Sequence, residues 1–365
     1  MKVAVLSLIV VVSCLAAVEP ANEPPFMLTP SWVALTGSDT AQLYLVLPSG
    51  DTVPARGATW TSSDSAIARV GPDGIVHSLR DGEALISASA ATSLGNIRGG
   101  AHVIVTPAVL VGAGDIGECA LTGAAETARL LDATPGIVFA AGDNAYPDGS
   151  LANYESCYAP TWGRHRDRTR PAPGNHDYRT LGASGYFAYF GANAGSPGTG
   201  YYSFRLGAWH VIVLNSNIPF GPASVQQAWL RNDLANHAGM CTVAYWHHPR
   251  FSSGRIGSDT NLTALWRTLE QGGTEVAITG HDHHYERFAP QLSDGTADAR
   301  GIREFVVGTG GGVLFPMGAE APNSEVRIPN TYGVLRLTLL AGSYRWSFIA
   351  APGGALLDSG TTACH

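Results

Sequence analysis

Five short polar blocks lie between residues 114 and 284, and four of them directly follow an apolar run typical of a buried strand. The carboxyl ends of neighbouring parallel strands meet at one edge of a sheet, where α/β proteins build their sites. The pattern therefore predicts an α/β domain whose strand ends bring the five blocks together. The blocks are Gly114-Asp115-Ile116-Gly117, Gly142-Asp143-Asn144-Ala145-Tyr146, Gly174-Asn175-His176-Asp177, His247-His248-Pro249 and Gly280-His281-Asp282-His283-His284.

Three stretches between or beside these blocks have helical character, at residues 124–132, 223–236 and 262–271. The first ends before Thr134-Pro135-Gly136 and the third ends before Gly272-Gly273, because proline and glycine stop a helix. Strands that alternate with helices argue for sheets covered by helices on the outside. Residues 108–365 are therefore expected to form the α/β domain.

Residues 27–107 contain short strand-like runs and no helical period. The turn segments Pro48-Ser49-Gly50-Asp51 and Gly71-Pro72-Asp73-Gly74 separate these runs. Closely spaced strands of this kind predict a small all-β sandwich. The segments Trp60-Thr61-Ser62-Ser63-Asp64 and Gly82-Glu83-Ala84-Leu85-Ile86 resemble the bacterial Ig-like domain of group 2. The resemblance implies a spacer or an adhesive unit that contacts the cell surface.

The first 18 residues have the pattern of an export signal, because Lys2 precedes an apolar run over residues 3–12 and then small residues. The run Val11-Val12-Ser13-Cys14 also resembles a bacterial lipobox, in which Cys14 would carry a lipid anchor. Cleavage after Ala16 or Ala17, which would release the protein, stays open as the alternative. The sequence thus predicts an exported protein that is periplasmic, secreted or lipid-anchored at the cell envelope.

Four cysteines follow Cys14, namely Cys119, Cys157, Cys241 and Cys364. An even number in an oxidising compartment favours disulfides over metal thiolates, and no pair has the close spacing of a zinc site. Four cysteines allow three pairings. We expect Cys119–Cys157 and Cys241–Cys364, because the first two follow adjacent polar blocks and the last would tie the C-terminal tail to a core strand.

The charge balance limits the partners of the chain. It has 22 basic residues, of which only Lys2 is a lysine, against 29 acidic residues, and its net charge is −7. A general nucleic-acid binder neutralises phosphates with basic side chains, so this composition argues against nucleic acid as a partner. A phosphate-binding site in this chain needs another source of positive charge.

The Asp, Asn, His and Tyr side chains of the blocks are oxygen and nitrogen donors for metals, and they are more numerous than one ion needs. Two ions that share a carboxylate would use the whole set and would suit an in-line displacement at phosphorus. The order Gly-Asp, Gly-Asp-x-x-Tyr, Gly-Asn-His, His-x-Pro, Gly-His-x-His resembles the calcineurin-like metallophosphoesterases, and within them the purple acid phosphatases, from residue 110 to about 290. The resemblance implies an α/β four-layer fold, with two packed β-sheets flanked by helices.

The resemblance also implies the metal ligands. Asp115, Tyr146 and His283 would hold the first ion, Asp143 would bridge both ions, and Asn175, His247 and His281 would complete the second site. Gly117 stands where many other metallophosphoesterases have the histidine of Asp-x-His, which together with Tyr146 points to the tyrosinate-ligated subgroup. A charged phenolate favours a trivalent ion. We therefore expect Fe(III) at the first site and Fe(II), Zn(II) or Mn(II) at the second.

The implied reaction is phosphate ester hydrolysis. The metal pair lowers the pKa of a bound water, and the resulting hydroxide attacks phosphorus while both ions offset charge on the phosphoryl oxygens. The prediction is an exported phosphatase that acts on small phosphate monoesters. Two alternatives stay open: a phosphodiesterase with the same metal site, and a surface-binding protein whose Ig-like module carries the main role.

Four further residues are candidates for contact with the substrate. His176, which follows Asn175, is expected to be the catalytic residue that hydrogen-bonds the substrate or protonates the leaving group. Asn144, His248 and Arg255 are candidate substrate contacts, and Arg255 offers a bidentate phosphate contact. Packing beside the site for His248, and a solvated loop position for Arg255, stay open. His165, His210 and His237 lie outside the blocks and receive no functional interpretation.

Overall fold

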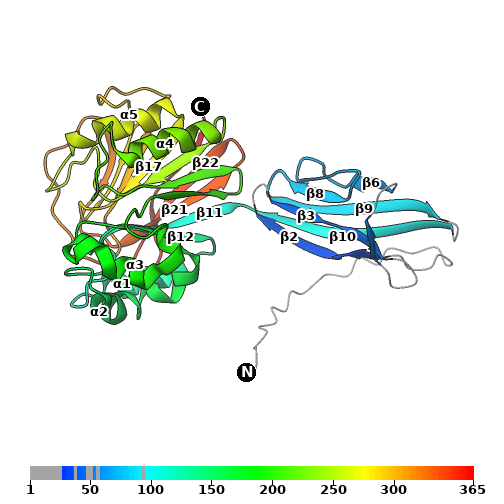
Figure 1. The fold of residues 1–365 in the computed structure, drawn as a ribbon, viewed down its shortest axis with the longest axis horizontal. Helices are drawn as coiled ribbons and strands as arrows, with labels where there is room; N and C mark the ends of the chain where they lie inside the picture. The colour runs from blue at the N-terminus through cyan, green and yellow to red at the C-terminus, as the bar shows by residue number, and fades with distance from the viewer. Residues whose placement is uncertain (1–26, 37–38, 47–51, 55–57, 93–94) are drawn as a thin grey trace.

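The computed structural model describes residues 27–36, 39–46, 52–54, 58–92 and 95–365. The predicted export signal and Cys14 lie outside the described residues. The described chain forms an all-β region followed by an α/β region, and β10 (Gly95–Thr106) leads directly into β11 (Ala108–Ala113) between the two (Figure 1). No described helix combines the length and the apolar character that crossing a membrane requires.

The N-terminal region contains three small sheets with strand orders β1-β4-β5, β2-β10-β9-β6 and β3-β8-β7. Buried residues alternate with exposed ones along β2, as in Val33 and Leu35, and they share one apolar core with Leu43, Ile86 and Val103. The expected all-β region is confirmed, whereas its likeness to an Ig-like module stays a prediction. The remaining strands are β1 (Met27–Thr29), β2 (Trp32–Thr36), β3 (Thr40–Gln42), β4 (Tyr44–Val46), β5 (Thr52–Pro54), β6 (Thr59–Ser62), β7 (Ala68–Val70), β8 (Ile75–Ser78) and β9 (Gly82–Thr92).

The α/β region is built on two sheets. A six-stranded sheet has the order β13-β12-β11-β21-β22-β23, and a seven-stranded sheet has the order β14-β15-β16-β17-β19-β18-β20. Their strands are β12 (Ile137–Ala141), β13 (Thr169–Ala172), β14 (Tyr202–Leu206), β15 (Trp209–Val213), β16 (Thr242–Tyr245), β17 (Thr274–Thr279), β18 (Tyr285–Phe288), β19 (Arg303–Val307), β20 (Ser324–Ile328), β21 (Gly333–Leu340), β22 (Ser343–Ala350) and β23 (Ala355–Ala363).

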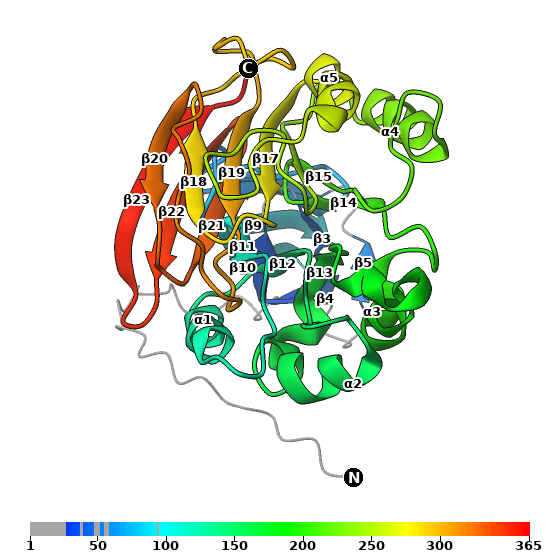
Figure 2. The same ribbon diagram turned by 90° about the vertical axis from the view of Figure 1, so that its left-hand side faces the viewer.

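The two sheets pack face to face and helices cover their outer sides (Figure 2). One apolar core lies between the sheets and contains Val111 and Phe139 of the first sheet with Val276 of the second. A second core, which includes Trp246 and Trp266, lies between the second sheet and its helices. The predicted four-layer arrangement is therefore confirmed. The helices are α1 (Gly123–Asp132), α2 (Leu151–Asn153), α3 (Ser184–Phe190), α4 (Val225–Asn236) and α5 (Thr263–Gln271).

The helix boundaries follow local capping. Helix α4 begins two residues later than the expected residue 223, because the Ser224 side chain accepts a hydrogen bond from the backbone N–H of Gln227 and so caps the helix at Val225. Helix α5 ends at Gln271, where Gly272 follows as expected. Helix α1 covers the predicted range and starts one residue earlier, at Gly123.

The two disulfides have the predicted pairing. Cys119–Cys157 joins the loop after β11 to the π-helical turn Tyr154–Tyr158, and Cys241–Cys364 joins the start of β16 to the end of the chain. The sulfur of Cys157 lies 4.0 Å from the carbonyl oxygen of Tyr146, so the first disulfide fastens the loops that carry two of the polar blocks.

Candidate metal centre

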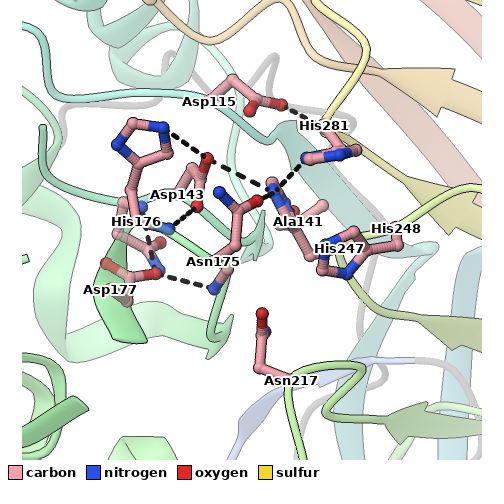
Figure 3. Close-up of polar contacts among 12 residues, drawn as sticks. Asp115, Ala141, Asp143, Asn175, His176, Asp177, Asn217, His247, His248 and His281 are labelled. Carbon is pink, nitrogen blue, oxygen red and sulfur yellow. Dashed lines mark hydrogen bonds and ion pairs between the residues drawn. The ribbon is translucent and has the colours of Figure 1, made fainter. Parts of the chain in front are cut away.

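The polar blocks meet at one edge of the sheets because the strands before them run in parallel. Strand β11 pairs in parallel with β12, and β12 with β13, while β16 pairs in parallel with β17. Asp115, Asp143, Asn175, His247 and His281 each follow the end of one of these strands. Figure 3 shows their side chains directed toward a common centre.

Three residues of this centre have a left-handed backbone, with φ of 60° at Asp115, 49° at Asp143 and 68° at His281. This conformation costs a residue with a side chain about 1–3 kcal/mol and persists only where the surroundings enforce it. The backbone N–H of His281 donates to the Asp115 carboxylate at 2.8 Å, so the two strained turns support each other. Gly142, which precedes Asp143, has a φ of 84° and lies against the His247 ring. A Cβ at this position would come within 2.7 Å of the His247 Cβ, so the close approach requires glycine.

The first group of donors surrounds the Tyr146 hydroxyl. It lies 3.0 Å from Asp115 Oδ1, 3.2 Å from His283 Nε2 and 3.3 Å from Asp143 Oδ2. His283 Nε2 is also 3.1 Å from Asp115 Oδ1. Four side chains from three separate parts of the chain thus point their donor atoms at one small volume.

The second group of donors surrounds His247 Nε2. This atom lies 3.0 Å from Asn175 Oδ1, 3.1 Å from His281 Nδ1 and 3.3 Å from Asp143 Oδ2. Asp143 Oδ2 therefore belongs to both groups and stands between them. The structure brings together all seven side chains that the sequence proposed as ligands, in the two sets that were proposed.

The buried carboxylates and imidazoles of this cluster shift one another's pKa values. Burial raises the pKa of Asp115, but His283 outweighs this effect and keeps that pKa below its usual value; His247 does the same for Asp143. Burial lowers the pKa of His247, yet Asp143 raises it to about 9. Burial, and then Asp115 and Asp143, hold the pKa of the Tyr146 phenol well above its usual value. Asp115 and Asp143 are 0% and 1% exposed. Two buried carboxylates among nitrogen and oxygen donors are suited to binding cations.

The histidines of the cluster are oriented by backbone carbonyls. His247 Nδ1 lies 2.9 Å from the Ala141 oxygen, and His283 Nδ1 contacts the Val313 oxygen. Since the carbonyl accepts a hydrogen from Nδ1, the neutral form of each ring has the lone pair of Nε2 toward the centre. Such outer partners fix both the tautomer and the direction of a metal-binding imidazole.

His176 lies at the open side of the cluster. Its backbone N–H donates to Asp143 Oδ1 at 2.7 Å, its Nδ1 lies 2.6 Å from the Pro147 oxygen, and its Nε2 is 3.9 Å from Asp143 Oδ2. The side chain is 20% exposed. The ring is thus held by Pro147 on one side, and Nε2 faces the centre on the other.

Asn144 is directed into the protein and not toward the open side. Its side chain is fully buried, and its amide nitrogen donates to the Ala172 oxygen at 3.0 Å and to Asp177 Oδ2 at 3.0 Å. Both amide hydrogens are therefore used. We leave Asn144 out of the substrate contacts and describe it as a residue that positions Asp177, which also accepts hydrogen bonds from Gly174 N–H and the Tyr154 hydroxyl.

His248 lies beside the second group of donors, with its ring centroid 4.4 Å from that of His281. Ser216 accepts a hydrogen bond from the His248 backbone N–H at 3.3 Å, and its hydroxyl lies 2.7 Å from His248 Nδ1. Burial, together with His247 and His281, lowers the pKa of His248 to about 2, so its ring is neutral. The sequence analysis missed Ser216, because a serine after β15 carries no motif of its own.

Arg255 is exposed and lies near the first group of donors. Its guanidinium carbon is 5.5 Å from the centre of the Phe315 ring, and that ring stacks on His283 at 4.2 Å between centroids. No carboxylate pairs with Arg255 in the part of the chain that the structure describes. Phe315 is a second residue that the sequence analysis missed, since its loop has no regular pattern.

Comparison with known proteins connects this geometry to a family. Residues 110–285 match the family model of the calcineurin-like phosphoesterases. Purple acid phosphatase 15 of Arabidopsis thaliana is 29% identical over 220 residues, which cover 50% of this chain and 41% of that protein. Purple acid phosphatase 21 of the same plant is 28% identical over 216 residues, which cover 52% of this chain and 49% of that protein. The chain thus spans less than half the length of these relatives.

The fold itself is shared with solved structures. A purple acid phosphatase from yellow lupin (Lupinus luteus) seeds superposes with a TM-score of 0.58 at 16% identity, over 90% of this chain and 68% of the lupin chain. GAP50, the anchor in the inner membrane complex of Plasmodium, superposes with a TM-score of 0.56 at 13% identity, over 71% of this chain and 89% of that chain. At such identities the likeness establishes the fold alone.

Proposed function

Residues 110–285 of this chain are a calcineurin-like phosphoesterase domain, and from that premise we propose that the protein hydrolyses phosphate monoesters at a pair of metal ions. One observation carries the proposal. Seven donor side chains from five strand ends form two groups, and Asp143 Oδ2 lies within 3.3 Å of the central atom of each group. This arrangement matches a pair of ions that share one carboxylate.

We assign the first ion to Asp115, Tyr146 and His283, the second to Asn175, His247 and His281, and the bridge to Asp143. When bound, such a pair lowers the pKa of water and offsets negative charge on a phosphoryl group. The first ion is proposed to be Fe(III), because that group contains a carboxylate and a phenol, and the second to be Fe(II), Zn(II) or Mn(II). The raised pKa of Tyr146 comes from burial and then from two neighbouring carboxylates, and an added cation would offset the charge of those carboxylates.

His176 is proposed as the general acid. Its Nδ1 keeps a hydrogen on the Pro147 oxygen, so the imidazolium form donates its proton from Nε2, which faces the centre. The leaving-group oxygen of the ester would receive this proton as its bond to phosphorus breaks. Because the Pro147 contact fixes the ring, the proton is delivered from a defined position.

His248 and Arg255 are proposed to bind the phosphoryl oxygens. When Ser216 donates its hydroxyl hydrogen to Nδ1, the neutral ring of His248 carries its own hydrogen on Nε2 and can donate it to an anion. Arg255 has no carboxylate partner in the described chain and offers a fork of N–H donors. Together with the cations, these groups would attract phosphate to a chain whose net charge is −7.

The proposal includes export from the cytoplasm. Two disulfides within one domain are typical of proteins in oxidising compartments. The N-terminal pattern of residues 1–18 points the same way, and lipidation of Cys14 is left as an open part of the proposal.

The test is hydrolysis of para-nitrophenyl phosphate and of bis-para-nitrophenyl phosphate by the purified full chain. We expect hydrolysis of the monoester to be faster than that of the diester, and Asp143→Asn to lose both. Asp132→Asn is the matched control, because Asp132 is a surface carboxylate paired with Arg164. Undiminished hydrolysis by Asp143→Asn would refute the metal-centre assignment, and preference for the diester would make the protein a phosphodiesterase.

A further inference from the structure

A second cluster of metal-binding side chains lies at the far end of the seven-stranded sheet. It consists of His210 on β15 with Asp233 and His237 at the end of α4, and each residue offers a donor atom within 4.8 Å of the others. His210 pairs with Thr242, the first residue of β16, whereas His247 lies two residues after the last residue of that strand. The cluster and the proposed centre therefore lie at opposite ends of β16.

His210 has an unusual environment for a buried histidine. Its side chain is fully buried, and its Nε2 forms an ion pair with Asp233 Oδ2 at 2.9 Å. Its Nδ1 has no hydrogen-bond partner within the described chain. Buried polar atoms without partners are costly, and a buried site of this kind commonly holds an ion or a water. A buried imidazole with one unpartnered nitrogen, next to a carboxylate and a second histidine, indicates a site that an ion can occupy.

The other members of the cluster support this arrangement. The Ser203 hydroxyl donates to Asp233 Oδ1 at 2.8 Å, which leaves Oδ2 directed at His210. His237 follows the last residue of α4 and its side chain is 29% exposed, with its ring stacked on that of His210 at 4.0 Å between centroids. A metal lies in the plane of an imidazole that binds it, so His237 must turn from this stacked position to join His210 and Asp233. His237 Nδ1 now lies 2.8 Å from the Asp233 backbone oxygen, a contact that this turn would replace with the ion.

We propose that His210, Asp233 and His237 bind a zinc ion that fastens the end of helix α4 to strand β15. Two imidazoles and one carboxylate, with water as a fourth ligand, form a donor set that Zn²⁺ uses widely. The His210 backbone N–H donates to the Cys241 oxygen at 3.0 Å, so the ion would lie next to the disulfide that holds the C-terminal tail. This position, away from the proposed catalytic centre, indicates a structural role. The inference does not rest on the proposed phosphatase function.

The experiment measures how many zinc ions the full-length chain binds. The protein is stripped with a chelator, equilibrated by dialysis against about 10 µM Zn²⁺, and analysed for bound zinc per chain by mass spectrometry of the metal. We expect the unmodified chain to bind one zinc ion more than His237→Gln and one more than Asp233→Asn. His165→Gln is the matched control, because His165 Nε2 also lies 3.0 Å from a carboxylate, that of Asp132, but has no second histidine.

Equal zinc content in the unmodified chain and in His237→Gln would overturn the proposal, as would an equal loss in His165→Gln. Because the result is a difference between variants, it is the same whether the proposed centre binds two, one or no zinc ions. A second readout is thermal unfolding, in which zinc should raise the midpoint of the unmodified chain more than that of His237→Gln, since an ion that binds only the folded state stabilises it. An equal rise in both proteins would also overturn the proposal. His237 is partly exposed, so its replacement should leave the fold intact, which circular dichroism checks.

Discussion

The two groups of donors that share Asp143 differ in charge. The group around Tyr146 contains the Asp115 carboxylate and a phenol that can ionise, whereas the group around His247 has only an amide and two imidazoles besides the shared carboxylate. Hard, charged oxygen donors suit a trivalent ion, and neutral nitrogen donors suit a divalent one. In the proposed pair of ions, the shared carboxylate would therefore join two sites that prefer different metals.

The surroundings of the two groups differ as well. His283 of the first group is covered by the stacked ring of Phe315, and Arg255 lies beyond that ring. The second group is bordered by His248, which Ser216 holds. The first group is therefore bordered by the apolar ring of Phe315 and the cationic side chain of Arg255. The second group is bordered by the neutral hydrogen-bond donor His248. We expect variants on the two sides to have separable effects.

The largest effect is expected for Asp143→Asn, because this change removes the one charge that both groups share. The rate of monoester hydrolysis should fall by about 10³-fold or more, as when a central catalytic group is removed. Bound metal at the centre should fall as well, which metal analysis of the purified variant measures. Asp132→Asn should keep both the rate and the metal. Loss of the rate with full retention of metal would show that Asp143 acts other than as a bridge.

The second largest effect is expected for Tyr146→Phe, which should change the visible absorption of the first group only. A phenolate bound to Fe(III) absorbs visible light by charge transfer, so the iron-loaded protein should be coloured and Tyr146→Phe should lose the whole band. Tyr178→Phe is the matched control, because the Tyr178 hydroxyl bonds to Asn215 outside the cluster. A colourless protein that contains only zinc or manganese would contradict Fe(III) at the first site, even if it hydrolyses esters.

The sequence predicted those parts of the centre that depend on strand ends. Parallel strands place the residues after them at one edge, so the spacing of the blocks predicted that they would meet, and the resemblance to the metallophosphoesterases implied which seven side chains are ligands. It could not give the direction of Asn144, because the partners that turn this side chain inward, Ala172 and Asp177, lie 28 and 33 residues further along the chain. Motifs describe which donors follow a strand, whereas the direction of each side chain depends on packing.

The same limit applies to the residues that the sequence analysis overlooked. Ser216 and Phe315 lie in loops without a periodic pattern, and only the structure places them against His248 and His283. His210 and His237 looked unremarkable because 27 positions separate them in the chain. The register of β15 and the packing of α4 on the sheet bring them together. Such contacts between elements leave no local signal in the sequence.

A smaller effect is expected for Asn175→Ala, which removes the amide oxygen 3.0 Å from His247 Nε2. Metal affinity of the second site should weaken by at least the roughly 10- to 100-fold that loss of an outer partner of a ligand costs, while the visible band of the first site remains. Titration of the stripped second site with Zn²⁺ measures the change. Asn217→Ala is the control, since Asn217 lies nearby (Figure 3) but donates to the Pro173 oxygen. Equal loss of metal from both sites in Asn175→Ala would contradict the division into two groups.

The smallest effect is expected for Ser216→Ala, which removes the hydroxyl that holds His248 Nδ1 at 2.7 Å. A hydrogen bond of this kind contributes about 0.5–1.5 kcal/mol, so the inhibition constant for inorganic phosphate should rise by roughly 2- to 10-fold. The metal content should stay the same, because Ser216 contacts no proposed ligand atom. Ser196→Ala replaces an exposed serine and should leave phosphate inhibition unchanged. If Ser216→Ala instead lowered the metal content and left phosphate inhibition as it was, His248 would support the ligands and not the substrate.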